Sequence, residues 1–573
     1  MKSLASYKKI IGIMFMAFIG VFLCTCRTYA CTAIYVGDEA SDNGTIIIGR
    51  SNDWQNNWAN YVVLTEHVDN EPGRTMPVDS GETVLVEIPA ETYKYISTPW
   101  MDATVAYNGN SHDAASAINE YGVAMTMSVT AFTNDEALAA DPEPSTGISE
   151  QTANDLVICQ SKTAREAVEV LLSLIDTYGS AESNIAIISD QNEAWYVEMY
   201  TGHQYAAVKL PRDKVAVFGN EYSLEYLSDY EDSIVSKDLE TLAKDNNFAV
   251  YDKNGELNIM KTYAIDYINY SHMRTWIGHK LLAPSLYDEE YDQNTDYSLT
   301  FKADNKVSLK DAMEVLRNRF EGTEYSPDEN GRIDTRVIGT DIAMSVHVLQ
   351  IYPDLPSDMA VINWESTSAA LYGAFVPFSV YETEIDSAYG LNQPAEETGN
   401  FDSDTYPWYA FKELNTLCLE DYRVYGNPVR EYWSNAEENM IKGMKEVLLK
   451  ASEIRKTSED DASKYVTDYC NGLQDKAFSD AKELLKTVIW WQCRYANTMK
   501  VGKNPETHEA TDEIIVHDPI EITMDGSYYA EVPEYTASAK EADENRDDIV
   551  IAVVVITIGT AIYFVDKKKK EEA

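Results

Sequence analysis

The sequence has few cysteines and few basic residues for its length, and each shortage excludes a class of protein. Seven cysteines among 573 residues are too few for a secreted fold built on disulfides. Lys and Arg number 46 against 95 Asp and Glu, which gives a formal net charge of −49. This charge excludes a nucleic-acid partner, because no basic stripe is available to neutralise phosphates. It suits a well-solvated acidic surface instead.

Patterns for metal binding and for a Ser-His-Asp triad are also missing. The chain has eight histidines but no H-E-x-x-H motif, no C-x-x-C pair and no acidic cluster with metal-ligand spacing. We therefore expect neither a metal nor a cofactor. The composition is that of a globular protein, with 45% hydrophobic and 11% aromatic residues. A chain of this length can bury one large domain with appendages.

Residues 1–30 have the pattern of a secretory signal peptide. Lysines precede an apolar stretch over residues 10–23, and Thr28-Tyr29-Ala30 is a small-x-small cleavage site. Cleavage after Ala30 would make Cys31 the first residue of the mature protein. A lipoprotein signal would also leave a cysteine first, but it requires an aliphatic residue three positions earlier, where this chain has Thr28.

The other end of the chain has the pattern of a membrane anchor. Residues 549–565 carry no charge and have the minimum length for a membrane-spanning helix. Lysines 567–570 follow, so residues 566–573 are expected to be a cytoplasmic basic tail. These features predict a single-pass protein of the cell membrane with its catalytic body outside the cell.

Between its ends, the sequence predicts a mixed α and β body. Short β-rich runs separated by turn residues occupy residues 31–129, and further strands are expected at residues 184–188, 194–200, 205–209 and 215–219. Between these two regions the sequence predicts a pair of helices, over residues 154–160 and 163–178. Antiparallel-looking strands beside helices favour an α+β body over a parallel sheet. Residues 404–500 predict amphipathic helices that extend this body, and residues 501–548 lose periodicity, as is typical of an acidic stalk.

An N-terminal cysteine has chemistry that an internal cysteine lacks. A buried cysteine is usually an inert hydrophobic residue. Processing after Ala30 would give Cys31 a free α-amino group, whose ordinary pKa of about 7.7–8.0 suits a general base. Thiol and amine on one residue can then act together as nucleophile and base, without a separate histidine.

Several short motifs follow Cys31 in a fixed order. They are Gly49-Arg50-Ser51-Asn52-Asp53-Trp54, Asn119-Glu120-Tyr121-Gly122-Val123-Ala124, Thr163-Ala164-Arg165-Glu166-Ala167, Asn192-Glu193-Ala194-Trp195-Tyr196-Val197-Glu198 with Tyr200-Thr201-Gly202-His203, Phe218-Gly219-Asn220, Arg274-Thr275-Trp276 and Val346-His347-Val348-Leu349-Gln350. In this order the sequence resembles the peptidase family C69 dipeptidases. These are cysteine N-terminal-nucleophile hydrolases related to penicillin V acylase and bile salt hydrolase. The resemblance covers most of residues 31–500.

The resemblance implies a fold and a set of residue roles. The fold would be the four-layer αββα sandwich of N-terminal nucleophile hydrolases, over residues 31–403, with the helical region behind it and the single transmembrane helix at 549–565. Cys31 would be the nucleophile and, through its amine, the base. Arg50 would lie near the sulfur and favour the thiolate, and Asp53 would orient the amine. Asn220 would donate to the oxyanion, and Arg274 would complete the polar network.

One position departs from the family pattern. The acylase relatives place an asparagine near the strand after the Asn-Glu-x-Gly turn, where this chain has Thr126-Met127-Ser128-Val129. The second oxyanion donor is therefore left open between Thr126, Ser128 and a backbone amide.

The predicted function is that of an exported, membrane-anchored cysteine dipeptidase that hydrolyses small peptides through a thioester. One alternative on the same fold is an acylase for acyl-amino acids or conjugated bile acids. Another is a lipid-anchored binding protein without catalysis, in which Cys31 would be acylated. The sequence leaves open whether the protein forms a homo-oligomer.

Overall fold

The computed structural model describes most of the chain from Cys31 to Tyr535. The described residues are 31–54, 59–99, 114–127, 129–332, 335–391, 402–495, 501–503, 507, 510–514 and 517–535. The predicted signal peptide, residues 1–30, and the predicted membrane segment with its tail, residues 549–573, lie outside them.

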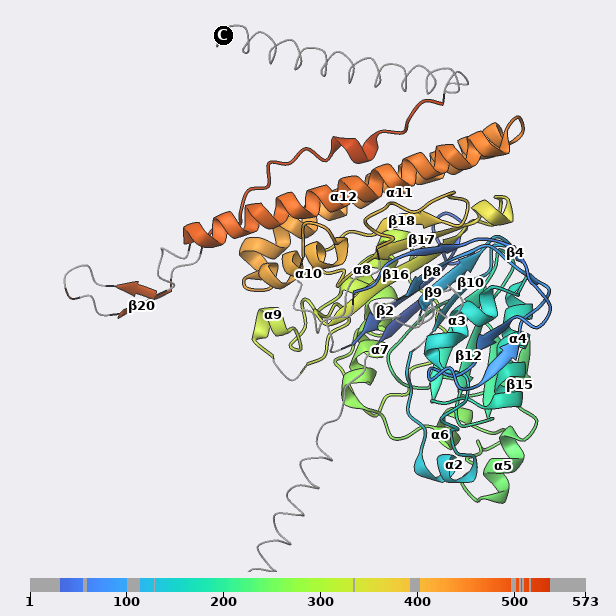
Figure 1. The fold of residues 1–573 in the computed structure, drawn as a ribbon. Coiled ribbons are helices and arrows are strands. Elements are labelled where there is room, and N and C mark those ends of the chain that lie inside the picture. Colours follow the sequence, from blue (N-terminus) through green and yellow to red (C-terminus); the bar gives the residue numbers. More distant parts are fainter. Residues whose placement is uncertain are drawn as a thin grey trace, which may run out of the picture. The chain divides into compact units, whose positions relative to one another are not determined.

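Two antiparallel sheets form the centre of the fold (Figure 1). The six-stranded sheet contains, in spatial order, β14 (Val215–Phe218), β1 (Thr32–Val36), β2 (Ile46–Asp53), β16 (Ala343–Ile351), β17 (Val361–Ser366) and β18 (Val376–Ser379). The eight-stranded sheet contains β15 (Ser233–Val235), β13 (Tyr205–Lys209), β12 (Ala194–Met199), β11 (Asn184–Ser189), β10 (Ala124–Met127), β9 (Ala114–Asn119), β8 (Tyr95–Pro99) and β3 (Val63–Thr65). Smaller pairs are β4 (Val68–Asp69) with β7 (Glu91–Thr92), β5 (Thr75–Pro77) with β6 (Leu85–Glu87), and β19 (Val501–Lys503) with β20 (Ala510–Ile514).

The inner faces of the two large sheets pack against each other. Strands β11 and β14 are buried at every residue, which is why they read as continuous apolar runs in the sequence. Side chains of β12 alternate between the two faces of its sheet. Trp195 and Val197 join the core under the helices, whereas the ring of Tyr196 lies 5.1 Å from that of Phe218 in the other sheet.

Helices cover the outer faces of both sheets. On the eight-stranded sheet these are α3 (Glu150–Ile158) and α4 (Ala164–Tyr178), and on the six-stranded sheet α7 (Asn269–Leu282) and α8 (Leu309–Arg317). Along β18 lie α11 (Asn427–Arg455) and α12 (Glu459–Tyr495), side by side, with α10 (Pro407–Cys418) against α12 (Figure 1). Shorter helices are α2 (Asp135–Ala140), α5 (Leu239–Asp245), α6 (Ile259–Tyr263) and α9 (Pro327–Asn330). The layers are therefore helix, sheet, sheet and helix.

Local signals explain the bounds of α4, which the sequence predicts closely. The Thr163 hydroxyl accepts the Glu166 backbone N–H at the start of the helix, as an N-cap does. Gly179 ends the helix with a φ of 79°, a conformation that favours glycine. Between these ends, apolar residues at helical spacing, including Leu171 and Ile175, are fully buried.

The predicted fold class needs one correction, which concerns the membrane-spanning helix. Among the residues that the structure describes, no helix is both long enough and apolar enough to cross a bilayer. The longest ones, α11 with 29 residues and α12 with 37, bury one side and carry Lys, Glu and Asp elsewhere. A fold class with a single transmembrane helix is therefore wrong as a description of this structure, and residues 549–565, on which it rested, lie outside the described part of the chain.

Part of the segment expected to be a stalk packs against the body. The backbone N–H of Ile520 donates to the carbonyl of Val424 at 2.9 Å. The hydroxyl of Tyr529, which is fully buried, donates to Asp480 on α12 at 2.7 Å. Residues 517–530 therefore lie along α11 and α12. The acidic, aperiodic sequence gave no sign of these contacts, because each is made by an isolated residue.

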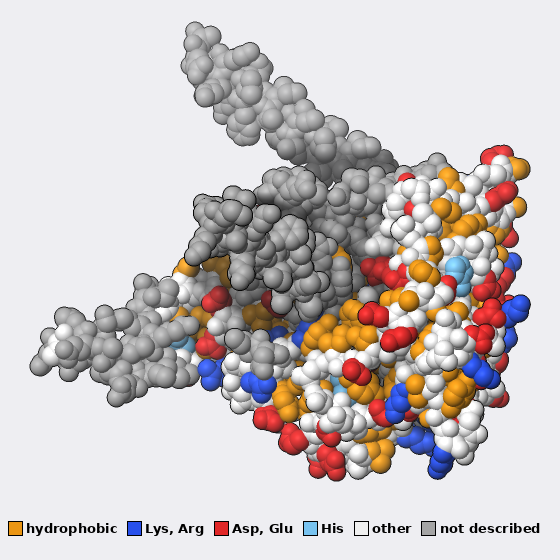
Figure 2. Space-filling model, turned by 90° about the horizontal axis from the view of Figure 1, so that it is seen from below, with side chains coloured by type: hydrophobic (Ala, Val, Ile, Leu, Met, Phe, Trp, Pro, Cys, Tyr) orange, Lys and Arg blue, Asp and Glu red, His pale blue; other side chains and the backbone are white. Residues whose placement is uncertain are grey.

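The charged side chains form a mixed surface rather than a single patch. On the face shown in Figure 2, Asp and Glu side chains are spread among hydrophobic ones, with Lys and Arg between them. Some of these charges pair, as Arg165 does with Asp232 at 2.6 Å. Exposed pairs of this kind contribute little to stability, so the acidic excess mainly affects solubility.

A buried ion pair between α8 and α11 leads to a prediction about the stability of the fold. Nη2 of Arg317 lies 2.5 Å from Oε1 of Glu437, and both side chains are at most 1% exposed. Glu437 also accepts the backbone N–H of Phe375 at 2.9 Å. We expect Glu437→Ala to lower the free energy of unfolding by about 3–5 kcal/mol, because the Arg317 charge stays buried without its main partner. Equilibrium unfolding in urea measures the loss.

The neighbouring glutamate provides a matched control. Glu438 is 51% exposed and pairs with Lys442 at 2.7 Å. Glu438→Ala should cost less than about 1 kcal/mol, because an exposed pair is screened by solvent. Similar small losses in both variants would contradict the prediction.

Candidate active site

The candidate site is built around Cys31, which precedes the first residue of β1. This strand lies between β14 and β2, where Ala33 pairs with Phe218 on one side and with Arg50 on the other. Asn220 follows the end of β14 by two residues. The side chain of Cys31 is 5% exposed, so its sulfur lies in the interior at the end of a central strand.

Arg50 connects the two sheets beside the sulfur. Its Nη1 lies 3.4 Å from Sγ of Cys31, and its Nε donates to the hydroxyl of Thr126 at 3.0 Å. Its Nη2 donates to the carbonyls of Ala115 and Met127 at 2.9 and 3.0 Å. The guanidinium is 1% exposed, and these bonds across the sheet interface compensate part of the cost of burying its charge.

Arg274 approaches Cys31 from α7. Its Nη1 donates to the carbonyl of Cys31 at 2.5 Å and to the hydroxyl of Thr32 at 2.8 Å. Its Nη2 donates to Oδ1 of Asn220 at 2.8 Å. The amide of Asn220 donates to the carbonyl of Thr130 at 2.7 Å. Because only Oδ1 can accept from an arginine, these bonds fix which way the amide points.

Arg274 stays charged in spite of its burial. Burial and the nearby cation Arg336 lower its pKa to about 10. This is well above neutral pH, so the side chain keeps its positive charge and its donors.

Asp53 ends β2 and is completely buried. Neither carboxylate oxygen has a hydrogen bond of good geometry with the described residues, although the Ser51 hydroxyl lies close enough to lower the pKa. Burial raises the pKa of Asp53 to about 7, against the opposing charges of Arg336 and Arg274. A buried carboxyl group without a donor is costly, which suggests that this residue is kept for a partner.

The Cys31 thiol is not a preformed thiolate in this chain. Burial raises its pKa above the ordinary value, and the charge of Arg50 lowers it only in part. The nearby Asp53 carboxylate raises the pKa further. The family resemblance implied that Arg50 favours the thiolate, and its effect has that direction, but burial outweighs it. Attack by this sulfur therefore requires a base.

All five predicted site residues lie around one point in the structure. They are Cys31, Arg50, Asp53, Asn220 and Arg274. Among the candidates for a second oxyanion donor, the Thr126 hydroxyl already accepts from Arg50 and lies 2.8 Å from Nε2 of His347. Ser128 lies outside the described residues.

Glu198 supports the site, and sequence reasoning assigned it no role. Its carboxylate accepts the hydroxyls of Tyr196 and Tyr200 at 2.5 and 2.7 Å. It also accepts the backbone N–H groups of Ser223 and Leu224 at 2.7 and 3.1 Å, and so it anchors the segment just after Asn220. A charged residue in the apolar strand β12 was the signal that could have indicated it.

Metal ligation finds no support in the described part of the chain. No group of three or more His, Cys, Asp or Glu side chains there is arranged to hold an ion. Cys159, Cys418 and Cys470 are buried as free thiols, and burial raises the pKa of each. Among the four buried cysteines that the structure describes, Cys31 is the one whose sulfur has an arginine nitrogen at hydrogen-bond distance, Nη1 of Arg50 at 3.4 Å.

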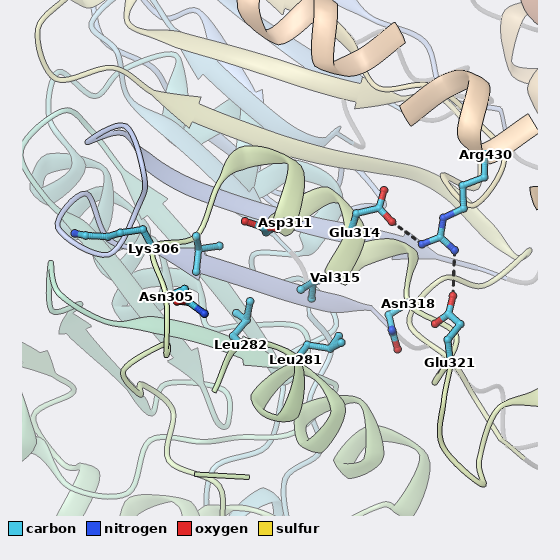
Figure 3. A pocket seen from close by; sticks show the side chains of 11 residues that line it. Leu281, Leu282, Asn305, Lys306, Asp311, Glu314, Val315, Asn318, Glu321 and Arg430 are labelled. Atoms are coloured by element: carbon cyan, nitrogen blue, oxygen red, sulfur yellow. Dashed lines mark hydrogen bonds and ion pairs between the residues drawn. The ribbon is translucent and has the colours of Figure 1, made fainter. Parts of the chain in front are cut away.

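A separate pocket of about 490 Å³ lies between α7, α8 and α11 (Figure 3). Its lining includes none of the five site residues. Arg430 lies at one end of it and pairs with Glu314 at 2.6 Å and with Glu321 at 3.0 Å. Both ion pairs share the one guanidinium of Arg430, so this end of the pocket keeps an excess negative charge.

Comparison with known proteins shows the family to which the chain belongs. The family model described as peptidase family C69 matches residues 30–435. The probable dipeptidase B of Streptococcus pyogenes serotype M1 is 28% identical over 430 residues, which cover 72% of this chain and 83% of the relative. The probable dipeptidase B of Lactococcus lactis subsp. lactis (strain IL1403) is 28% identical over 81% of this chain and 96% of its own. The probable dipeptidase of Latilactobacillus sakei is 29% identical over 63% of this chain and 76% of its own. The chain therefore belongs to peptidase family C69.

Proposed function

We propose that this protein is a dipeptidase in which Cys31, freed by cleavage after Ala30, attacks the peptide carbonyl with its own α-amino group as the base. The observation that carries the proposal is the position of the Cys31 sulfur, 3.4 Å from Arg50 and at the residue that a signal peptidase would expose. The names of the relatives, which are probable dipeptidases, support a dipeptide substrate.

The first half of the cycle forms a thioester. The α-amine takes the thiol proton while Sγ bonds to the carbonyl carbon, and the carbonyl electron pair moves to the oxygen. The remaining N–H of Asn220 donates to this oxyanion; one such donor lowers the barrier by about 3–4 kcal/mol. The intermediate collapses, the C–N bond breaks, and the ammonium gives its proton to the leaving amine.

The second half hydrolyses the thioester. The α-amine, neutral again, takes a proton from water as the water attacks the same carbonyl carbon. Collapse of the second intermediate breaks the C–S bond and returns the proton to the sulfur. Arg274 holds the carbonyl of Cys31 through both halves, which keeps the nucleophile at the end of β1.

Asp53 is the proposed partner of the freed amine. It is a buried carboxylate next to Cys31, and a nearby ammonium would lower its pKa from about 7 and supply the missing donor. Cleavage after Ala30 is thus proposed to export the protein and to activate it in one step.

An acylase for acyl-amino acids or conjugated bile acids remains the alternative on this fold. The two reactions share the attack on an amide carbonyl, so the site residues do not separate them. A comparison of turnover for dipeptides and for acylated amino acids decides between them. Faster turnover of the acylated compounds would replace the dipeptidase proposal.

Replacement of Cys31 tests the mechanism directly. We expect Cys31→Ala in the mature form to lower kcat by at least about 10³-fold, because no other nucleophile replaces the sulfur. Thermal unfolding should show that the variant is folded. Cys418→Ala, which removes a buried thiol from α10, is the control and should keep its activity. An active Cys31→Ala enzyme would refute the mechanism.

Amino-terminal sequencing of the exported protein tests the processing. We expect Cys31 to be the first residue.

The raised pKa of Asp53 leads to a second prediction, whose outcome differs between the unprocessed chain and the mature chain. With the Ala30–Cys31 bond intact, the pKa of Asp53 is about 7 in the folded state, against 3.8 for an ordinary aspartate side chain. Asp53 destabilises the fold increasingly as the pH rises from about 4 to 7, because over this range its carboxyl group loses its proton in the unfolded chain but keeps it in the folded one. Asp53→Asn should therefore stabilise the unprocessed chain at about pH 8, by roughly 2–4 kcal/mol, and not at about pH 3.

In the mature form this gain should disappear, because the ammonium of Cys31 would stabilise the Asp53 carboxylate. Urea unfolding of both forms at the two pH values measures the effect. A gain of the same size at both pH values in the unprocessed chain would contradict the assigned titration.

A further inference from the structure

An asparagine lies on each side of Cys31, one in β2 and the other just after the end of β14. In the register of β1 with β2, Thr32 pairs with Ser51 and Ala33 with Arg50, so the next residue places Asn52 opposite Cys31. On the other side, Asn220 follows the end of β14 by two residues, and Arg274 donates both to its Oδ1 and to the carbonyl of Cys31. Residues opposite each other in an antiparallel pair share a face of the sheet. The side chains of Asn52 and Cys31 therefore point the same way.

The orientation of the Asn52 amide is determined by Arg50. Nη1 of Arg50 donates to Oδ1 of Asn52 at 3.3 Å, and the same Nη1 lies 3.4 Å from Sγ of Cys31. An arginine cannot accept a hydrogen bond, so the oxygen must be the atom that faces it. The amide nitrogen, Nδ2, is therefore the other end of a group that is held beside the sulfur.

This Nδ2 is a buried donor without an acceptor among the described residues. Asn52 is 7% exposed, and its nitrogen is closed to solvent. An unsatisfied buried donor costs about 1–3 kcal/mol, so a native structure keeps one only for a reason. The position beside Cys31 suggests that the acceptor belongs to the substrate.

Thr126 and Asn220 already use some or all of their side-chain donors. The Thr126 hydroxyl accepts a hydrogen bond from Nε of Arg50 and lies 2.8 Å from Nε2 of His347. When this hydroxyl donates its one O–H to that nitrogen, it has no donor left for an oxyanion. Asn220 gives one N–H to the carbonyl of Thr130 and has one left. A single N–H satisfies only part of the capacity of an oxyanion, which accepts more than one hydrogen bond.

We propose that Nδ2 of Asn52 is the second oxyanion donor, acting with Asn220 from the other side of Cys31. The inference rests on the proposed attack by Cys31. When the sulfur bonds to the carbonyl carbon, the carbonyl electron pair moves to the oxygen, and this oxygen accepts one N–H from each asparagine. When the oxyanion collapses, the pair returns to the C–O bond and the C–N bond breaks. The donors give up no proton in either step.

Substitution of Asn52 tests the assignment in the mature, full-length enzyme. We expect Asn52→Ala and Asn52→Asp to lower kcat for a dipeptide by about 10²–10³-fold with KM nearly unchanged, because the donor acts on charge that develops in the transition state. An amino-acid aldehyde, which adds to the sulfur and places a charged oxygen in the same position, should lose affinity by a similar factor.

Alkylation of Cys31 by iodoacetamide separates this role from an effect on the nucleophile. The displacement forms no oxyanion, so Asn52→Ala should react as fast as the parent enzyme. Asn363→Ala is the matched control: Asn363 is a buried asparagine of β17, and its amide donates to Glu365 at 3.2 Å. It should change kcat far less, and thermal unfolding shows that each variant is folded.

The outcomes distinguish the two proposals. A fully active Asn52→Ala enzyme together with an inactive Cys31→Ala enzyme would overturn the donor assignment alone. Slower alkylation in Asn52→Ala, in proportion to its loss of kcat, would also overturn it, because the residue would then act on the sulfur. An active Cys31→Ala enzyme would overturn both.

Discussion

The buried guanidinium of Arg50 is the interaction on which the rest of the structure depends. It lies between the two sheets, where it is 1% exposed, and it donates to Thr126, Ala115 and Met127 in the opposite sheet. A buried guanidinium is stable only if its N–H groups donate to acceptors in the protein. The spacing and register of both sheets are therefore fixed by the positions of these acceptors. The same group reaches the sulfur of Cys31, and the catalytic geometry is thereby coupled to the packing of the core.

The burial that stabilises this arrangement also decides the chemistry. In an exposed site, a nearby arginine would favour a thiolate. Here the dry interior raises the pKa of the Cys31 thiol and of the Asp53 carboxyl group, so neither is charged in its ordinary pH range. The proposed attack by Cys31 then needs a base beside the sulfur, and the amine that cleavage after Ala30 would create meets this need. The burial that stabilises the fold therefore also sets the protonation states of Cys31 and Asp53, on which the proposed mechanism depends.

The sequence predicts the elements that bear periodic patterns and misses those that depend on single contacts. Strands β11 to β14 and helix α4 were located closely, because their apolar runs and caps are local signals. The five site residues came from the family motifs and the cleavage site. Glu198 and Asn52 were quoted in motifs without a role, since their roles follow from register and hydrogen bonds. Residues 517–530 were misjudged for the same reason, because composition alone does not specify a packing partner.

The place of β1 between β14 and β2 has a consequence for the durability of the enzyme. A chain terminus usually frays, and its amine is then open to trimming by aminopeptidases, to acetylation and to carbamylation. In the mature protein the terminus would begin a strand that is hydrogen-bonded on both sides, with Cys31 only 5% exposed and its carbonyl held by Arg274. An enzyme whose base is its own first atom must protect that atom from other enzymes. Sequestering the terminus in the middle of a sheet provides this protection.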